Sequence, residues 1–79
     1  MHGNFNGFRL GKITSRIIST SDRGTTLYSF RTREHVPQLE AALRLDSPAL
    51  LILSHETIEG RIAHYSADLL AGYEVTIEY

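Results

Sequence analysis

The amino-acid sequence predicts one α+β domain, a two-layer sandwich in which two helices pack on one face of a four-stranded mixed sheet. Three observations support this fold class. The 79 residues leave room for a single domain, 1–79, and for only a thin core. Apolar residues make up 42% and charged residues 22% of the chain, which is the composition of a globular protein. Segments with the alternating pattern of strands interleave with segments of helical spacing, in the order ββαβαβ.

The first third of the chain predicts a flexible N-terminal segment followed by a β-hairpin. Residues 1–7 contain two glycines and two asparagines, so we expect a flexible N-terminal segment. Residues 8–20 are rich in β-forming side chains, but the apolar positions change parity at Gly11, where we expect a bulge. Residues 21–24 (SDRG) predict a turn, because aspartate bonds its own backbone and glycine supplies a positive φ. Residues 25–31 then form the second strand.

Residues 32–45 are predicted to form the first helix. Thr32 is a suitable N-cap, and Pro37 indicates that the regular helix begins near Val36, because proline is tolerated in the first turn and not later. Apolar residues then recur every three or four positions. Residues 46–48 (DSP) end the helix.

Residues 49–53 (ALLIL) are apolar on both faces and are too few for a helix of typical length. They predict a central strand buried on both sides. With both helices on one face of the sheet, a chain of this length has little left to cover the other face. We therefore expect a homodimer or a docked partner there.

Residues 54–71 are predicted to form the second helix. Ile58, Ile62 and Tyr65 follow one another at spacings of four and three residues, which places them on one helical face. Gly60 lies inside this span and costs up to about 1 kcal/mol relative to alanine. It either permits a close crossing over the sheet or marks a later start of the helix.

Charge is balanced over the whole chain, with a formal net charge of −1, but not along it. Up to residue 37 there are six Lys and Arg against two Asp and Glu, and beyond it two against seven. Such asymmetry indicates either interaction surfaces or two halves that neutralise each other in the fold.

Several chemistries have no support in the sequence. Cysteine is absent, which excludes disulfides, thiolate metal sites and a cysteine nucleophile. No glycine-rich phosphate loop and no serine elbow is present. His55 with Glu59, and His64 with Asp68, stand four residues apart on the predicted helix, but two side chains make neither a metal site nor a catalytic pair. We expect no enzyme activity, no metal and no cofactor.

The leading functional hypothesis is a small protein-interaction module that docks on a larger protein, as an inhibitor or regulator. Residues 73–79 (YEVTIEY) alternate cleanly and predict the last strand, which at the edge of a sheet offers unpaired backbone groups to a partner. The residues expected to bind are acidic or polar side chains of this strand and of the predicted second helix: Glu74, Thr76, Glu78, Glu56 and Glu59.

The alternative is a protein that binds single-stranded or double-stranded nucleic acid through its basic N-terminal half. Phe5 and Phe8 interleave with cations. Bases of a single-stranded nucleic acid stack on aromatic rings while cations attract its phosphates, so this combination suits such a ligand. The competing interpretation places the aromatic residues in the core. The residues expected to bind in this alternative are Arg9, Lys12, Arg16 and Arg31.

In size and composition alone, the chain resembles small accessory proteins of phages and mobile elements. Anti-CRISPR proteins, which block a site on a larger complex, are an example. The resemblance carries no motif, so it assigns no residue. No secretory signal is present in residues 1–10, and we expect a cytoplasmic protein.

Overall fold

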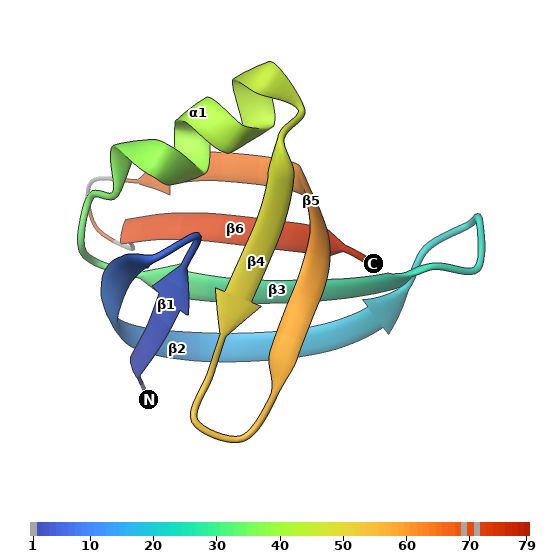
Figure 1. Cartoon of the computed structure of the whole chain (residues 1–79), viewed down its shortest axis with the longest axis horizontal. Helices are drawn as coiled ribbons and strands as arrows, with labels where there is room; N and C mark the ends of the chain where they lie inside the picture. The colour runs from blue at the N-terminus through green and yellow to red at the C-terminus, as the bar shows by residue number, and fades with distance from the viewer. Residues whose placement is uncertain (1, 69, 71) are drawn as a thin grey trace.

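The chain folds as a closed barrel of antiparallel strands, which overturns the predicted mixed sheet with two helices. The computed structural model describes residues 2–68, 70 and 72–79. Within these residues there are six strands and one helix (Figure 1). The elements are β1 (His2–Phe5), β2 (Phe8–Thr20), β3 (Thr26–Thr32), α1 (Pro37–Leu45), β4 (Pro48–Ile52), β5 (Thr57–Asp68) and β6 (Gly72–Glu78).

The strand order around the barrel is β1-β2-β3-β6-β5-β4, and β1 closes it by pairing with β4. Two strands are long, β2 with 13 residues and β5 with 12. The first part of β2 pairs with β1 and the rest with β3, whereas β5 pairs first with β4 and then with β6. Each long strand therefore turns a corner of the barrel.

Glycine is needed where β5 turns this corner. A Cβ added at Gly60 would lie 2.1 Å from the backbone oxygen of Glu78, so only a residue without a side chain lets β5 pass β6 this closely. Both alternatives expected at Gly60, a helix crossing closely over the sheet and a later start of the helix, are wrong, because Gly60 lies within a strand. At the other corner, Leu10 is an extra residue of β2 relative to β1, and Gly11 has a φ of +74°, as expected for a bulge there.

The predicted second helix is wrong, because residues 57–68 form β5. Ile62 lies opposite Ile77, and His64 lies opposite Thr76, so one extra residue of β5 bulges between them. Before the bulge the even-numbered side chains of β5, such as Ile62, point into the barrel; after it the odd-numbered ones do, such as Tyr65. Tyr65 therefore follows Ile62 at a spacing of three. A bulged strand has therefore produced the spacing of a helix. Residues 69 and 71 of the predicted helix lie outside the described residues.

The N-terminal segment is also different from the expectation. Residues 2–5 form β1, and Phe5 is fully buried opposite Leu51 of β4. The ladder partners of β1 lie on both sides, within β2 and within β4. This segment closes the barrel, so the prediction of a flexible start is wrong for the described residues.

Helix α1 begins at Pro37, with Val36 extended before it, as the proline indicated. Thr32 is not its N-cap. It is the last residue of β3, and its buried hydroxyl donates a hydrogen bond of 2.9 Å to the Leu10 carbonyl. Asp46 ends the helix in the left-handed conformation, at the predicted place. The helix lies across one end of the barrel (Figure 1).

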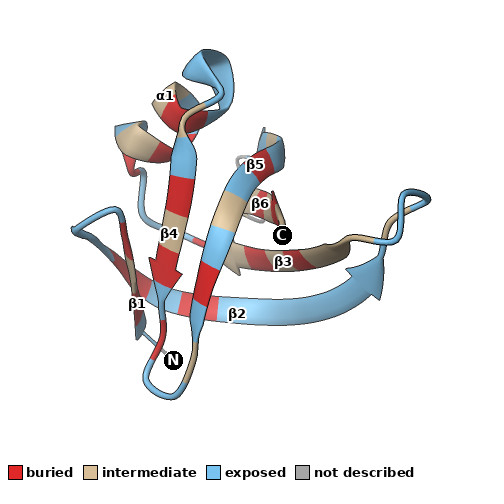
Figure 2. Cartoon of the chain, turned by 45° about the vertical axis from the view of Figure 1, so that its right-hand side comes forward, coloured by how far each residue is buried: buried red, intermediate tan, exposed pale blue. Residues whose placement is uncertain are grey.

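The core fills the barrel and the space beneath α1. Strand β4 contributes Ala49 and Leu51, whereas Ile52 points outward and is 44% exposed. The expectation of a strand buried on both faces is therefore wrong, and the homodimer inferred from it stays a prediction without that support. The second half of β2 is exposed along its length, whereas β3 alternates (Figure 2). Among the described residues no helix has the length and apolar character to cross a membrane.

Candidate functional site

The outward face of β3 and β6 is a ladder of paired polar side chains. Arg31 lies opposite Glu74, and its guanidinium donates to the carboxylate at 2.9 Å. The hydroxyls of Ser29 and Thr76 are hydrogen-bonded at 2.8 Å in the next row. Directly opposite positions of an antiparallel pair share a face, so these contacts follow from the register. Cations of the first half of the chain are neutralised here by anions of the second half.

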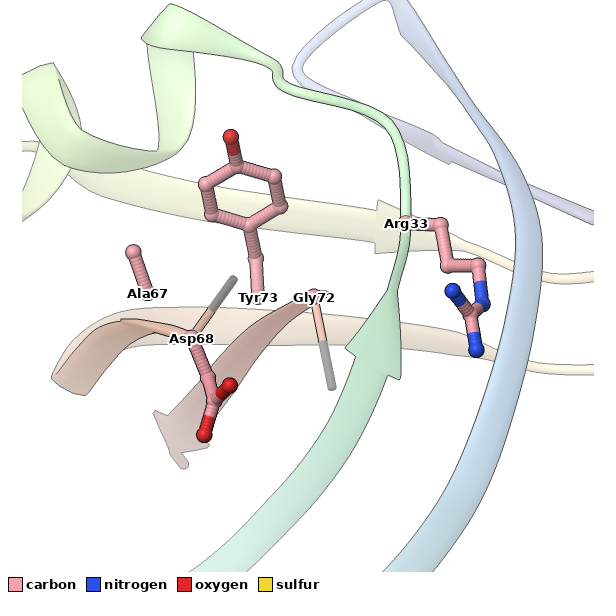
Figure 3. A pocket seen from close by; sticks show the side chains of 5 residues that line it. All are labelled: Arg33, Ala67, Asp68, Gly72 and Tyr73. Carbon is pink, nitrogen blue, oxygen red and sulfur yellow. The ribbon is translucent and has the colours of Figure 1, made fainter. Parts of the chain in front are cut away.

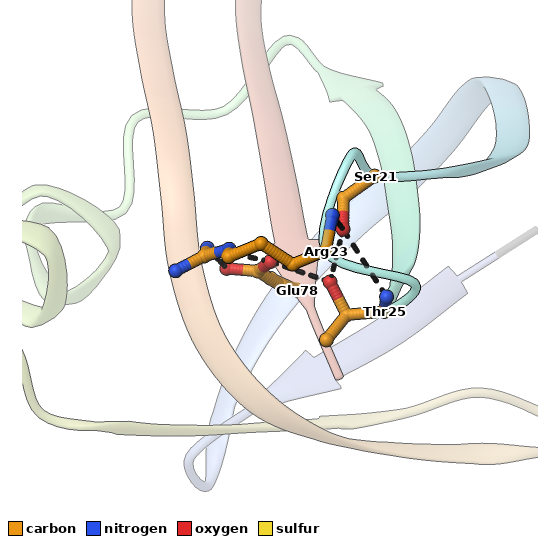
Figure 4. Close-up of polar contacts among 4 residues, drawn as sticks. All are labelled: Ser21, Arg23, Thr25 and Glu78. Carbon is orange, nitrogen blue, oxygen red and sulfur yellow. Dashed lines mark hydrogen bonds and ion pairs between the residues drawn. The ribbon is translucent and has the colours of Figure 1, made fainter.

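The same pattern continues at the end of this face around Glu78 (Figure 4). Its carboxylate accepts a hydrogen bond of 2.5 Å from the Thr25 hydroxyl and two from the Arg23 guanidinium, at 2.5 and 2.7 Å. The Thr25 hydrogen bond is the largest cause of a lowered pKa of Glu78; Arg23 and Ser21 add to it and desolvation opposes it. Glu78 is therefore held as an anion by the β2–β3 turn.

These contacts change the interpretation of the predicted docking strand. β6 lies between β3 and β5, so it is not the edge of a sheet, and its backbone groups are paired on both sides. The prediction of an open edge is wrong. Glu74, Thr76 and Glu78 face outward together, but each already has a side-chain partner on β3 or the preceding turn. Glu56 and Glu59 lie at the other end of β5, alongside β4.

The two histidine pairs are not formed, because their helix is a strand. His64 faces Glu74, with 4.0 Å between the Nε2 and Oε1 atoms, and Asp68 lies four positions further along β5, which corresponds to about 13 Å in a strand. His55 lies in the β4–β5 turn, 3.0 Å from the Ser54 hydroxyl. In the part of the chain that the structure describes, no three His, Asp or Glu side chains are grouped as a metal site would require.

A second outward face, on β2, also carries cations. Arg9 lies opposite Asn4 and Lys12 opposite His2, so both project from the barrel beside β1. Arg16 is exposed in a second bulge of β2. With Arg33, just after β3, they form what we call the β2 strip: Arg9, Lys12, Arg16 and Arg33. None of the four makes an ion pair with a residue in 2–68, 70 or 72–79.

The strip contains a hollow of about 200 Å³ lined by Lys12, Thr14, Arg33 and Glu34. Two cations and one hydroxyl face one carboxylate there, which leaves a net positive lining. The Glu34 carboxylate lies against Gly11, where a Cβ would approach its Oε1 atom to 2.6 Å. The bulge glycine thus makes room for an acid within the basic face.

Arg33 also lines a second hollow, of about 230 Å³, at the rim where the chain leaves β3 for α1. Figure 3 shows Arg33 reaching toward β2, while the Tyr73 ring points toward the helix. Ala67, Asp68 and Gly72 complete the lining. Arg33 therefore connects the basic face with the aromatic residues at this rim.

Three rings are stacked in a row beside that hollow. His35 and Tyr73 have centroids 5.4 Å apart at 28°, and Tyr73 and Tyr65 have centroids 6.1 Å apart at 20°. Burial, followed by the neighbouring Tyr73 and Glu40, raises the pKa of Tyr65 above its ordinary value, so this ring stays neutral at physiological pH. His35 is exposed and forms the open end of the row.

Sequence reasoning missed this ring stack and chose other aromatic residues. Phe5, Tyr28 and Phe30 are buried in the core and cannot stack on a ligand. Phe8 is 47% exposed, but it borders a hollow beneath α1 with Leu45. The missed signal was the β5–β6 hairpin, whose register brings Ala67 opposite Tyr73 and thereby places the two tyrosine rings close together.

Comparison with known proteins gives no relative. No family model matches the chain, and no curated protein or solved structure shows a significant similarity to it. The geometry of the chain itself is therefore the basis for a functional proposal.

Proposed function

We propose that this protein binds nucleic acid through the β2 strip. The observation that carries the proposal is the contrast among cations of the same half of the chain. Arg23 and Arg31 are paired with glutamates of β6, whereas the four strip cations project from the barrel without an ion-pair partner among the described residues. An unpaired row of cations is the electrostatic feature that phosphate backbones recognise.

The dimensions of the strip suit a phosphate backbone. Arg9 and Arg16 are separated by seven positions of one strand, which at a rise of 3.3 Å per residue sets an upper limit of about 23 Å on their separation, because β2 bends and bulges between them. Lys12 lies between them on the outward face. Each cation that neutralises a phosphate releases condensed counterions, so binding is expected to weaken steeply with salt.

The docking hypothesis based on Glu74, Thr76 and Glu78 has less support. The carboxylates of Glu78 and Glu74 already accept hydrogen bonds from Arg23 and Arg31, and a partner would have to compete with these arginines. A protein partner would also find no open strand at β6. The absence of catalysis and of a cofactor, and a cytoplasmic location, stay predictions.

The test is fluorescence anisotropy with labelled single-stranded DNA and RNA and with duplex DNA, each of about 20 nucleotides per strand, between about 50 and 200 mM salt. The variant is Arg9→Gln with Lys12→Gln. The control is Arg44→Gln with Arg61→Gln, which removes the same net charge from α1 and from β5, away from the strip.

We expect the strip variant to lose about tenfold in affinity at the lower salt and to reduce the salt slope for single strands by about 1.4. The control variant should bind as the wild type does. Absence of binding by the wild type at low salt, or equal losses in both variants, would overturn the proposal. In the second case the attraction would depend on net charge and not on this face.

A further inference from the structure

We infer that the end of the β2 strip is a subsite for one nucleotide of a single strand, with a phosphate held by Lys12, Thr14 and Arg33 and the unpaired base stacked on His35. This inference rests on the proposed function and adds two things to it: the form of nucleic acid, and the place where a base is bound.

The phosphate side is the hollow on β2. Lys12 and Thr14 are outward neighbours two positions apart, opposite His2 and Arg31. Arg33 approaches the same hollow from the segment after β3, and the space of about 200 Å³ is open to solvent. An ammonium, a guanidinium and a hydroxyl are donors that together satisfy several oxygens of one phosphate. Among the lining residues, only Glu34 carries a negative charge that would repel a phosphate.

The base side is the row of rings over the rim. Tyr73, the middle ring of the row, lies opposite Thr32, the residue before the phosphate-binding Arg33. Arg33 and Tyr73 line the same hollow of about 230 Å³ (Figure 3). Tyr65 and Tyr73 are half-buried and support the row from within, whereas His35 is exposed at its outer end. A flat base can extend the row at that end.

This arrangement selects single strands for a geometric reason. In a duplex both faces of each internal base are covered by its neighbours, so the base cannot stack on a protein ring without leaving the helix. An unpaired base has a free face, and stacking on a protein ring is tolerant of sequence. The cations alone would bind either form, since they contact phosphates only.

The first experiment removes the ring at the open end of the row. His35→Ala is expected to lower the affinity for single-stranded DNA about tenfold and to leave duplex binding unchanged. His35→Phe keeps a ring without the charge of a protonated imidazole, and it should restore single-strand binding. Thermal unfolding of both variants serves as the check on the fold. The probe is a labelled deoxythymidine oligonucleotide of about 20 residues, with a hairpin duplex of equal charge as its counterpart.

The second experiment tests the phosphate side. Glu34→Gln removes the one carboxylate of the hollow and should raise the affinity for both forms about threefold, because a like charge beside the phosphate is removed. The control Glu59→Gln changes the net charge equally at an exposed position of β5 beside β4. It should leave both affinities unchanged.

The outcomes separate this inference from the proposal beneath it. If Arg9→Gln with Lys12→Gln weakens binding while His35→Ala does not, the strip binds nucleic acid and the subsite is wrong. Equal losses of single-strand and duplex binding in His35→Ala would also overturn the subsite, since the ring would then contribute charge or folding. If the wild type binds no nucleic acid at low salt, both fail.

Discussion

Two outward faces of this barrel carry arginines from the same half of the chain, and the arginines have different surroundings. On β3 and the turn before it, Arg31 and Arg23 meet Glu74 and Glu78 of β6 across the ladder. On β2, Arg9 and Lys12 meet Asn4 and His2 of β1, which carry no anion. Strand neighbours, and not the charge of a segment, therefore decide which cations remain available to a ligand.

The net charge of this small barrel does not indicate how its charged side chains are distributed over the surface. The chain is almost neutral, with a formal charge of −1. The neutralisation expected between the two halves is found where β6 pairs with β3, whereas an interaction surface on the cations that β6 does not reach stays a prediction. A local basic face can exist on a protein of this composition.

The strongest way to break the difference between the faces is to free the paired cations. Glu74→Gln with Glu78→Gln leaves Arg31 and Arg23 without carboxylate partners, so the face of β3 and β6 should become basic as well. We expect higher affinity for single-stranded DNA and a salt slope steeper by about 1.4, measured by anisotropy. Unchanged binding would mean that this face is too far from the strip to share a ligand.

A second prediction concerns acid and the Glu78 contact. The folded-state pKa of Glu78 is lowered, mainly by the Thr25 hydrogen bond and further by Arg23. Its contribution to stability is therefore fully present above the ordinary carboxyl pKa of 4.5 and is lost as the pH falls through the lower folded value. Wild type should exceed Glu78→Gln in stability at neutral pH, and the gap should close in acid.

This prediction is measured by urea unfolding of both proteins at neutral pH and at steps below about pH 4. Asp22→Asn is the control, because it removes the charge of an exposed carboxylate in the same turn. A stability gap that does not change with pH would show that Glu78 acts through packing and not through its charge.

The smallest expected effect is that of a single pair on the ladder. Arg31 and Glu74 are 40% and 38% exposed, so water and salt weaken their attraction. A double-mutant cycle with Arg31→Ala and Glu74→Ala should give a coupling free energy of about 0.2–1 kcal/mol. The proximity of His64 to Glu74 adds to the coupling only where the imidazole is protonated. A coupling well above this range would indicate a network and not a surface pair.

Some parts of the fold were predictable from the sequence because their signals are local. The turn at residues 21–24, the start of α1 at Pro37, its end at Asp46 and the last strand follow from turn chemistry, proline geometry and alternation. Of the strip, Arg9, Lys12 and Arg16 were predicted as candidates for nucleic-acid binding. Arg31 was predicted too, but it is paired with Glu74.

The sequence by itself determined that the chain is one globular unit without cysteine chemistry, with a basic half, an acidic half and a few well-marked turns. Only the tertiary structure decided that residues 57–68 are a strand, that β6 is internal, and that His35 stacks beside Tyr73 and Tyr65. The physical reason is the same in each case. A strand takes its hydrogen bonds and its charge partners from residues distant in sequence, and a single bulge can give it the apolar spacing of a helix.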